Sequence, residues 1–443
     1  MHMQKNGLPA ILLIFVVGAS ASLFATNTTV GSCPGPGFHY STIGMALLHT
    51  TVNGTVSVCP GTYPEQVNIT QAVTVKGVAG SGTDAAVIVP PAGGIAVNGA
   101  DIFGNPVAAQ IFVANSGSVT ISHLTVDGTG NNLNGCVVTT LEGIYFQNTS
   151  GTITDNAVRN QYQSDYADYG GCQNGLAINV ESTTSNNTVS VTYNSVRAYQ
   201  KNGITATGAA TGPGSLGPDV TISNNYIVGM GATAMNWQGV YLSQGTAAEN
   251  GVQIGFGARG SVSTNTVNDN IWGQDTSSDT GDAASGILIY SSDGITVSGN
   301  NVGSAQFGIV TVTDPTYGPA DDTTISSNKV AGTQLFDAID VCSNSNTVHS
   351  NTVYGSTESG VHVDDSCGTG NNNTVTSNIV NEACAGILLG TGTGNTTSPN
   401  TYNNVVNTTL AGDVCPVAGP DSRLTGSKRQ KALRPSPFKP GRK

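Results

Sequence analysis

Nine asparagines of this chain occupy the same six-residue frame, with one apolar residue three positions before the asparagine and another two positions after it. The frames are centred on Asn156, Asn194, Asn225, Asn265, Asn300, Asn328, Asn351, Asn378 and Asn404, and the last begins with Thr401 and fits loosely. Successive asparagines are 23 to 40 residues apart. Recurrence at such intervals indicates stacked structural repeats.

A second motif, usually a glycine followed by alternating apolar residues, comes after most of these frames. Examples are GLAINV from residue 175, GITAT from 203, GILIY from 286, GIVTV from 308 and GVHV from 360. The alternation predicts strands, so each repeat contains at least two of them. Repeats of 23 to 28 residues leave no room for a helical crossover, and successive strands are therefore expected to stack directly in parallel.

The stacking explains why asparagine recurs at a fixed place. Strands of neighbouring coils lie ~4.8 Å apart, so equivalent asparagine side chains can hydrogen-bond to one another in a ladder. A buried amide is tolerated when its hydrogen bonds are satisfied. The alternative is that asparagine only marks turns, but a turn preference alone would not keep it in one register between two apolar positions.

The two ends of the chain differ from the repeats. Residues 1–25 are typical of a secretion signal, with Lys5 followed by an apolar run and small residues before the cleavage site; an uncleaved anchor is the alternative. Residues 26–421 are expected to form one solenoid. Its N-terminal cap, at about 38–78, includes a short helix from Tyr40 to Leu48 with Ser41 or Thr42 as N-cap. Residues 422–443 are basic and are expected to be disordered.

Composition agrees with short strands and tight turns. The chain has 58 glycines, and only 9% of its residues are charged. Its eight cysteines favour an oxidising compartment. Proximity in sequence suggests the pairs Cys33–Cys59, Cys136–Cys172, Cys342–Cys367 and Cys384–Cys415, and no zinc site is expected, because the cysteines lack metal-type spacing.

Charge is divided unevenly along the chain. Eight of the 15 basic residues follow Asp421, and a ninth, Lys5, lies in the signal segment. The body therefore carries 6 basic against 27 acidic residues, a formal charge of −21. Such a surface repels nucleic acid and anionic lipid, and it repels polyuronates unless a divalent cation bridges them. No membrane span is expected after the signal.

On these repeats the chain resembles the right-handed parallel β-helix proteins of the pectin-lyase-like superfamily. The stretch with STIGMALL, VSVCPGTYPEQVNI and VTVKGV looks like the start of pectinesterase-type members. The resemblance implies an all-β, right-handed parallel β-helix with a short N-terminal capping helix. It leaves the activity open, because the superfamily includes lyases, hydrolases, epimerases, tailspikes and adhesins. Most of their activity motifs are missing; Asp364-Asp365-Ser366-Cys367 is only similar to the paired aspartates of polygalacturonases.

Candidate chemistry lies on the outward positions of the second motif. When the second motifs are aligned, including AIDV at 338, which lacks the glycine, Asp340 and His362 face outward on neighbouring coils. Asp364 follows His362 ~6.5–7 Å along the strand. One histidine with two carboxylates could perform acid–base catalysis, and two carboxylates could hydrolyse a glycosidic bond. A solvated surface ion pair and a Ca²⁺ site are the alternatives.

The same alignment places several tyrosines on outward positions, where Tyr145 is followed by Ala177 in the next coil. Tyr145, Tyr241 and Tyr290 are candidates for stacking on sugar rings. Ordinary packing of strand tyrosines against their neighbours is the alternative.

Together these features favour a secreted bacterial protein that acts on or binds extracellular polysaccharide. The first hypothesis is a glycan hydrolase that uses Asp340, His362 and Asp364, with a hydrolase preferred to a lyase because basic residues are scarce in the body. The second is a non-catalytic adhesion or structural solenoid of the cell surface. The sequence predicts no nucleic-acid partner and leaves the oligomeric state open.

Overall fold

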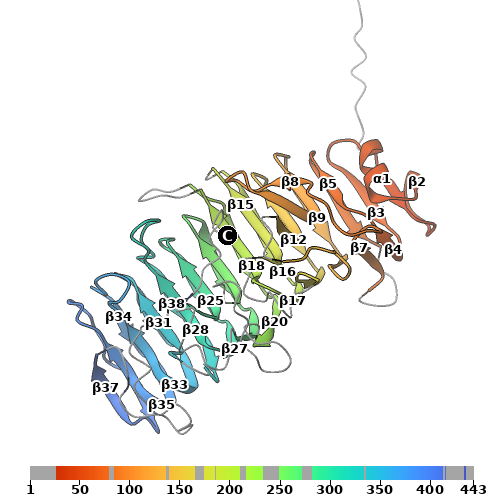
Figure 1. Cartoon of the computed structure of the whole chain (residues 1–443). Coiled ribbons are helices and arrows are strands. Elements are labelled where there is room, and N and C mark those ends of the chain that lie inside the picture. The colour runs from red at the N-terminus through yellow and green to blue at the C-terminus, as the bar shows by residue number, and fades with distance from the viewer. Residues whose placement is uncertain are drawn as a thin grey trace, which may run out of the picture.

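A computed structural model describes residues 26–78, 84–135, 139–164, 174–184, 186–209, 216–232, 249–271, 282–333, 336–412, 415 and 434–435. Parallel strands stack from the N-terminal to the C-terminal end of the molecule as successive coils (Figure 1). The expected all-β solenoid with one short helix near its N-terminus is thereby confirmed.

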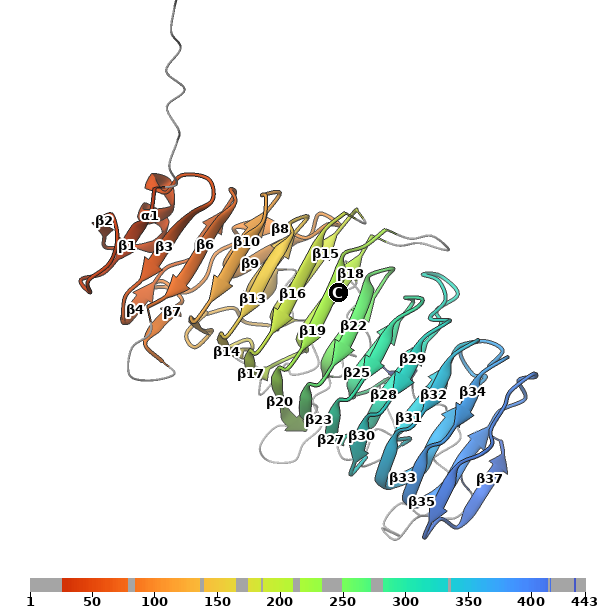
Figure 2. The same cartoon turned by 180° about the vertical axis from the view of Figure 1, so that it is seen from behind.

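The coils contribute to three rows of strands. The first row, a 13-stranded sheet seen in Figure 2, contains β1 (Thr28–Val30), β2 (Phe38–Tyr40), β3 (Gly54–Val58), β6 (Val73–Gly77), β10 (Val119–Ser122), β13 (Gly151–Thr154), β16 (Thr188–Thr192), β19 (Asp219–Ser223), β22 (Arg259–Ser263), β26 (Thr296–Ser298), β29 (Thr324–Ser326), β32 (Thr347–His349) and β34 (Thr374–Thr376). The second row contains β4 (Gly61–Pro64), β7 (Ala86–Val89), β11 (Thr125–Asp127), β14 (Ala157–Gln161), β17 (Ser195–Tyr199), β20 (Tyr226–Ala232), β23 (Thr266–Ile271), β27 (Asn301–Ala305), β30 (Lys329–Ala331), β33 (Thr352–Val363), β35 (Ile379–Leu389) and β36 (Thr401–Asn403).

The third row carries the second sequence motif. It contains β5 (Val67–Ile69), β8 (Gly99–Ala100), β9 (Pro106–Ala114), β12 (Thr140–Gln147), β15 (Leu176–Ser182), β18 (Asn202–Gly208), β21 (Asn250–Gly255), β25 (Ser285–Tyr290), β28 (Phe307–Val312), β31 (Ile339–Cys342) and β37 (Asn407–Ala411). The long strands β33 and β35 run through both the second and the third row. A separate pair joins β24 (Asp282–Ala283) to β38 (Arg434–Pro435), which brings this part of the C-terminal tail back to the middle of the solenoid.

The cap helix α1 (Ile43–His49) lies at the N-terminal end of the stack. The Thr42 side chain accepts a hydrogen bond from the Met45 amide at 3.2 Å. The Glu65 carboxylate accepts bonds from the amides of Ile43 (2.7 Å) and Gly44 (3.0 Å). The first turn of the helix therefore has acceptors for its free N–H groups.

Apolar side chains fill the interior in continuous rows. The residue two positions after each of the first eight frame asparagines is buried and pairs with its equivalent in the neighbouring coil. These residues form one row of Val158, Val196, Ile227, Val267, Val302, Val330, Val353 and Val380. Repetition of the same apolar pattern in every coil thus builds one core along the whole stack.

The asparagine ladder is confirmed. In a representative step, Asn265 Oδ1 accepts bonds from both the backbone N and the Nδ2 of Asn225, each at 2.9 Å. Asn265 Nδ2 donates to the Ile222 carbonyl (2.9 Å) and to Asn300 Oδ1 (3.0 Å). Each asparagine side chain therefore satisfies hydrogen-bonding groups of the asparagine in the neighbouring coil, which a simple turn preference would not require.

The last rung differs from the sequence prediction. Asn378 donates from its backbone N (2.8 Å) and from Nδ2 (3.0 Å) to Asn400, not to Asn404. Asn404 is exposed, with a φ of 52°. The loosely fitting final frame was thus misaligned, because the turn before β36 places the amide four residues earlier.

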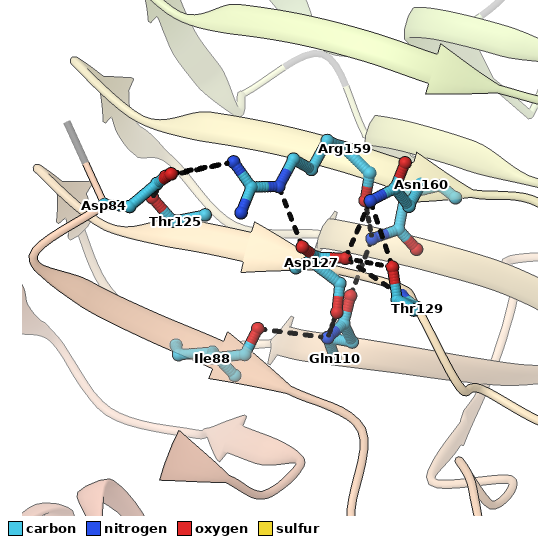
Figure 3. A network of polar contacts seen from close by, with 9 residues as sticks. Asp84, Ile88, Gln110, Thr125, Asp127, Thr129, Arg159 and Asn160 are labelled. Carbon is cyan, nitrogen blue, oxygen red and sulfur yellow. Dashed lines mark hydrogen bonds and ion pairs between the residues drawn. The ribbon is translucent and has the colours of Figure 1, made fainter. Parts of the chain in front are cut away.

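A polar network ties three coils together on the outside of the second row (Figure 3). Arg159 Nε lies 2.8 Å from Asp127 Oδ2, and Arg159 Nη1 lies 3.0 Å from Asp84 Oδ1. Asn160 and Thr129 also donate to Asp127 Oδ1. These hydrogen bonds outweigh the effect of partial burial and lower the pKa of Asp127.

Three of the four expected disulfides are present, Cys33–Cys59, Cys342–Cys367 and Cys384–Cys415. Cys136 and Cys172 lie outside the described residues. Within the described part of the chain, no helix has the length and apolar character needed to cross a membrane.

Candidate functional site

The third row brings the predicted acid–base residues together. Asp340 on β31 is the direct partner of His362 on β33 in the parallel register, and Asp364 follows the end of β33. The predicted solvent exposure of these residues is wrong. Asp340 is 3%, His362 4% and Asp364 7% exposed. Alternation within a strand shows which residues point out of the coil, but it does not show what other chain segments cover them.

A further aspartate, Asp337, completes the cluster. Its Oδ2 lies 3.2 Å from His362 Nδ1, and its Oδ1 accepts a bond from Ser359 Oγ at 2.5 Å. Asp337, Asp340 and His362 each place one oxygen or nitrogen within 4.8 Å of the others. Its position just before β31 made the role of Asp337 uncertain in the sequence, because strand ends are poorly placed by periodicity.

The electrostatics of the cluster divide its members into different charge states. Burial opposes the charged form of His362, but the attraction of Asp337 and the hydrogen bond to it outweigh burial and raise the histidine pKa to about 10. Burial and the neighbouring charge of Asp364 raise the pKa of Asp340 well above its usual value. Burial and the neighbouring charges of the cluster therefore favour the protonated forms of His362 and Asp340.

Asp364 has a different environment. Its Oδ1 accepts a hydrogen bond from the Ser366 backbone N (2.7 Å), and its Oδ2 accepts one from Ser366 Oγ (2.7 Å). The Cys342–Cys367 disulfide joins β31 to the turn that contains Asp364. The turn is thus covalently fixed to the strand that carries Asp340.

Two buried atoms of the cluster have no hydrogen-bond partner among the described residues, namely Asp340 Oδ1 and His362 Nε2. Such atoms can bind a polar group of a ligand. The donor set fits Ca²⁺ poorly, because that ion takes six to eight oxygen ligands and a cationic imidazole lies between the carboxylates. What the arrangement can do chemically is supply a proton from Asp340, a carboxylate from Asp364 and a hydrogen-bond donor from His362.

The tyrosine candidates lie elsewhere on the same row. Tyr145 is buried, its ring lies 5.2 Å from that of Phe112 at an interplanar angle of 18°, and its hydroxyl donates to Glu181. Tyr290 is also buried; its ring centroid lies 5.2 Å from Phe256 and its hydroxyl contacts Asp314. Their predicted exposure is therefore wrong, and their role in stacking on sugar stays a prediction. Tyr241 lies outside the described residues.

Sequence reasoning also missed a second acidic group of the third row. Tyr145 pairs with Asn179, not with Ala177, so the alignment on Gly175 was wrong by two residues. The corrected register places Glu181 beside Gln147, on the same face as Tyr145 and Asn179. Alternation along β15 could have indicated this glutamate, because it lies two positions after Asn179.

Comparison with known proteins agrees with this architecture. Residues 219–402 match the model of a family described as "Right handed beta helix region". No curated protein matches the sequence.

Solved structures with the same architecture include the selenomethionine derivative of the GH136 lacto-N-biosidase from Eubacterium ramulus, with a TM-score of 0.55 and 12% identity over 86% of this chain and 67% of that one. The native form of that enzyme has a TM-score of 0.52 and 12% identity, and the match covers 80% of this chain and 62% of the enzyme's chain. PfbA, a surface adhesin of Streptococcus pneumoniae, has a TM-score of 0.49 and 12% identity, and the match covers 82% of this chain and 86% of the adhesin's chain. The chain therefore has the fold of a right-handed parallel β-helix.

Proposed function

We propose that the protein binds extracellular polysaccharide and hydrolyses a glycosidic bond at the cluster of Asp340, His362 and Asp364. The observation that carries this proposal is the difference in environment between two neighbouring carboxyl groups. The pKa of Asp340 is raised by burial and by Asp364, whereas Asp364 accepts two hydrogen bonds from Ser366. A pair of one acid and one base is the arrangement that glycoside hydrolysis requires.

Each residue then has one role in the reaction. Asp340 donates its proton to the leaving glycosidic oxygen as the C–O bond breaks. Asp364 accepts a proton from the water whose hydroxide bonds to the anomeric carbon. His362, oriented by Asp337, donates a hydrogen bond from Nε2 to a sugar hydroxyl. The net change is the addition of one water across the bond, and it requires no cofactor.

Charge narrows the substrate to neutral glycans. The body carries 6 basic and 27 acidic residues, which disfavours a polyanion unless a cation bridges it. The lacto-N-biosidase with the same fold is named for action on a glycan, which supports the substrate class at the level of fold. The three disulfides favour a secreted or surface location.

A screen for reducing ends tests the proposal. Wild-type protein and the Asp340→Asn and Asp364→Asn variants are incubated with neutral polysaccharides, and with polyuronates with and without Ca²⁺. We expect the hydrolysis rate of each variant to be ~10²–10⁴-fold lower than that of wild-type protein. Asp322→Asn is the matched control, because Asp322 is exposed, lies outside the cluster and has a φ of 56°, which asparagine tolerates. Hydrolysis that survives in both cluster variants would remove the catalytic assignment.

The alternative is a non-catalytic adhesion or structural protein of the cell surface. The burial of the three cluster residues favours this alternative, because a glycan can reach them only if the covering chain moves. Binding of a polysaccharide in calorimetry without release of reducing ends would support it.

A further inference from the structure

A second buried acidic group lies on the third row, five coil steps before Asp340, or ~24 Å away at the spacing of stacked strands. Its floor contains Glu142 on β12 and Asn179 and Glu181 on β15, each at most 1% exposed. Asn179 Nδ2 donates to Glu142 Oε1 (3.1 Å) and to Glu181 Oε1 (3.2 Å). A single amide therefore bridges two carboxyl groups that lie far apart in the sequence.

A short loop between β8 and β9 roofs this group. Asp101 folds the loop on itself, because its side chain accepts bonds from the amides of Phe103 (2.9 Å) and Asn105 (2.8 Å). Gly104 has a φ of 88°, which a residue with a Cβ rarely adopts. The loop is thus a compact unit held by its own hydrogen bonds.

Hydrogen bonds join the loop and its flank to the floor. The Ile102 amide donates to Glu181 Oε2 at 3.2 Å, and Gln147 Nε2 donates to the Ala100 carbonyl at 2.6 Å. The Tyr145 hydroxyl donates to the same Glu181 oxygen at 2.6 Å. Glu181 is therefore the point where the roof meets the floor.

The floor has hydrogen-bonding capacity that the protein does not use. Asn179 Oδ1 is fully buried and has no partner among the described residues. Thr207 Oγ1, on the strand next to Glu181, is likewise buried without a partner. Buried polar atoms are nearly always satisfied in folded proteins, so unsatisfied ones indicate a missing partner.

We propose that the loop Asp101–Asn105 is a lid over a second glycan-binding site whose floor is Glu142, Asn179 and Glu181. The ligand chemistry follows from the floor, which offers carboxyl oxygens, an amide oxygen and hydroxyl groups. These accept hydrogen bonds from sugar hydroxyls, and the acidic surroundings exclude an anionic ligand. The choice of a glycan as ligand rests on the proposed function; the lid itself does not.

When the lid opens, the Ile102–Glu181 bond breaks and Glu181 becomes free to accept a sugar hydroxyl. The lid is also expected to respond to pH. Burial and the nearby charge of Asp101 together raise the pKa of Glu181 from 4.5 to about 7, against the opposing hydrogen bonds from Tyr145 and the Ile102 amide. The other titratable group that faces this site is Glu142.

A carboxyl group whose pKa is higher in the closed state stabilises closure at low pH. That stabilisation is complete below pH ~4.5 and is lost as the pH rises to about 7. Opening should therefore increase as the pH rises across this range.

Hydrogen exchange at the Ile102 amide, corrected for the intrinsic pH dependence of exchange, measures the opening. Wild-type protein should exchange faster at pH 7.5 than at pH 5. Glu181→Gln should remove this pH dependence, because glutamine cannot ionise. Glu65→Gln is the matched control, since Glu65 also accepts backbone amides but lies at helix α1. Exchange without any dependence on pH in wild-type protein would overturn the lid.

Binding of neutral hexasaccharides, namely cello-, laminari-, xylo- and mannohexaose, tests the floor. Calorimetry at pH 7.5 should detect at least one of them. Asn179→Ala should weaken that binding at least tenfold, while the pH dependence of exchange at Ile102 stays as in wild type. Equal affinity of wild type and Asn179→Ala would overturn the second site.

The Asp340→Asn variant separates this proposal from the proposed hydrolysis. It should keep both the pH-dependent exchange at Ile102 and the binding that depends on Asn179. Loss of hydrolysis with these two properties intact would support both proposals. Absence of hydrolysis in wild type with these two properties present would refute only the proposed function.

Discussion

Replacing Asn265 by alanine tests the physical basis of the fold. The substitution removes the acceptor of the Asn225 backbone N and one of the acceptors of Asn225 Nδ2, both at 2.9 Å. It also removes the donor to the Ile222 carbonyl at 2.9 Å. Asn225 Nδ2 keeps its bond to the Val191 carbonyl (2.8 Å), and Asn300 Oδ1 loses the bond from Asn265 Nδ2 but keeps the one from the Asn265 backbone N (2.9 Å). Two groups therefore lose their ladder partner entirely, and two others each lose one of two bonds.

These losses set the size of the effect. A buried group left without its hydrogen bond costs ~1–3 kcal/mol, so we expect the free energy of unfolding to fall by roughly 3–6 kcal/mol. A loss of this size is comparable with the whole stability of many domains, ~5–15 kcal/mol. A single asparagine in the middle of the stack should therefore matter as much as a large core residue.

Urea unfolding followed by circular dichroism measures the difference. The matched control is Asn403→Ala, because Asn403 is exposed and makes one side-chain bond, to Asn381 at 2.8 Å. That change should cost less than ~0.5 kcal/mol. If the two variants unfolded at the same urea concentration, the ladder would add nothing to stability, and the reasoning from buried amides would be refuted.

Two further predictions concern charge. The pKa of His362 is raised from 6.5 to about 10, so its stabilising contribution is complete below pH 6.5 and is lost as the pH rises towards 10, by up to ~5 kcal/mol. The free energy of unfolding of His362→Gln, measured over this pH range, should therefore vary less with pH than that of wild-type protein. Parallel pH profiles of the two proteins would refute the buried ion pair. Arg159→Ala should cost about 1 kcal/mol at pH 7, since its partners are partly exposed. That cost should shrink as the pH falls through the lowered pKa of Asp127, and a cost that stays constant down to pH 2 would contradict the charge-based assignment.

Much of the fold could be predicted because the repeats obey a local rule. An asparagine at a fixed distance from two apolar residues specifies both a rung of the ladder and a buried row, so the sequence of one coil already implies its contact with the next. The exception, Asn400 in place of Asn404, occurs in the last frame, where an apolar position is replaced by Thr401.

The candidate site could be predicted only in part. The pairing of Asp340 with His362 was predictable because the two residues are only 22 positions apart and Ala338 occupies the motif position that Gly360 has in the next coil. The exposure of these residues was not, because it depends on segments distant in sequence. The register at β15 failed for another reason. Both Gly175 and Ala177 can occupy the small position of the motif, and only the structure shows that Ala177 lies beside Gly143 in the stack.

The fold was easier to predict than the candidate site because of the way a solenoid is built. Inward positions repeat in every coil because each coil must pack on the next, whereas the outward position of the third row changes at each step. Its residues are Tyr145, Asn179, Thr205, Gln253, Leu288, Val310, Asp340, His362 and Leu388. No packing rule selects this order, so any function must be read from the local chemistry of two or three adjacent coils. On this row, Asn179 Oδ1 and Asp340 Oδ1 are two of the buried polar atoms that have no hydrogen-bond partner among the described residues, and a ligand at either place would supply what the protein does not.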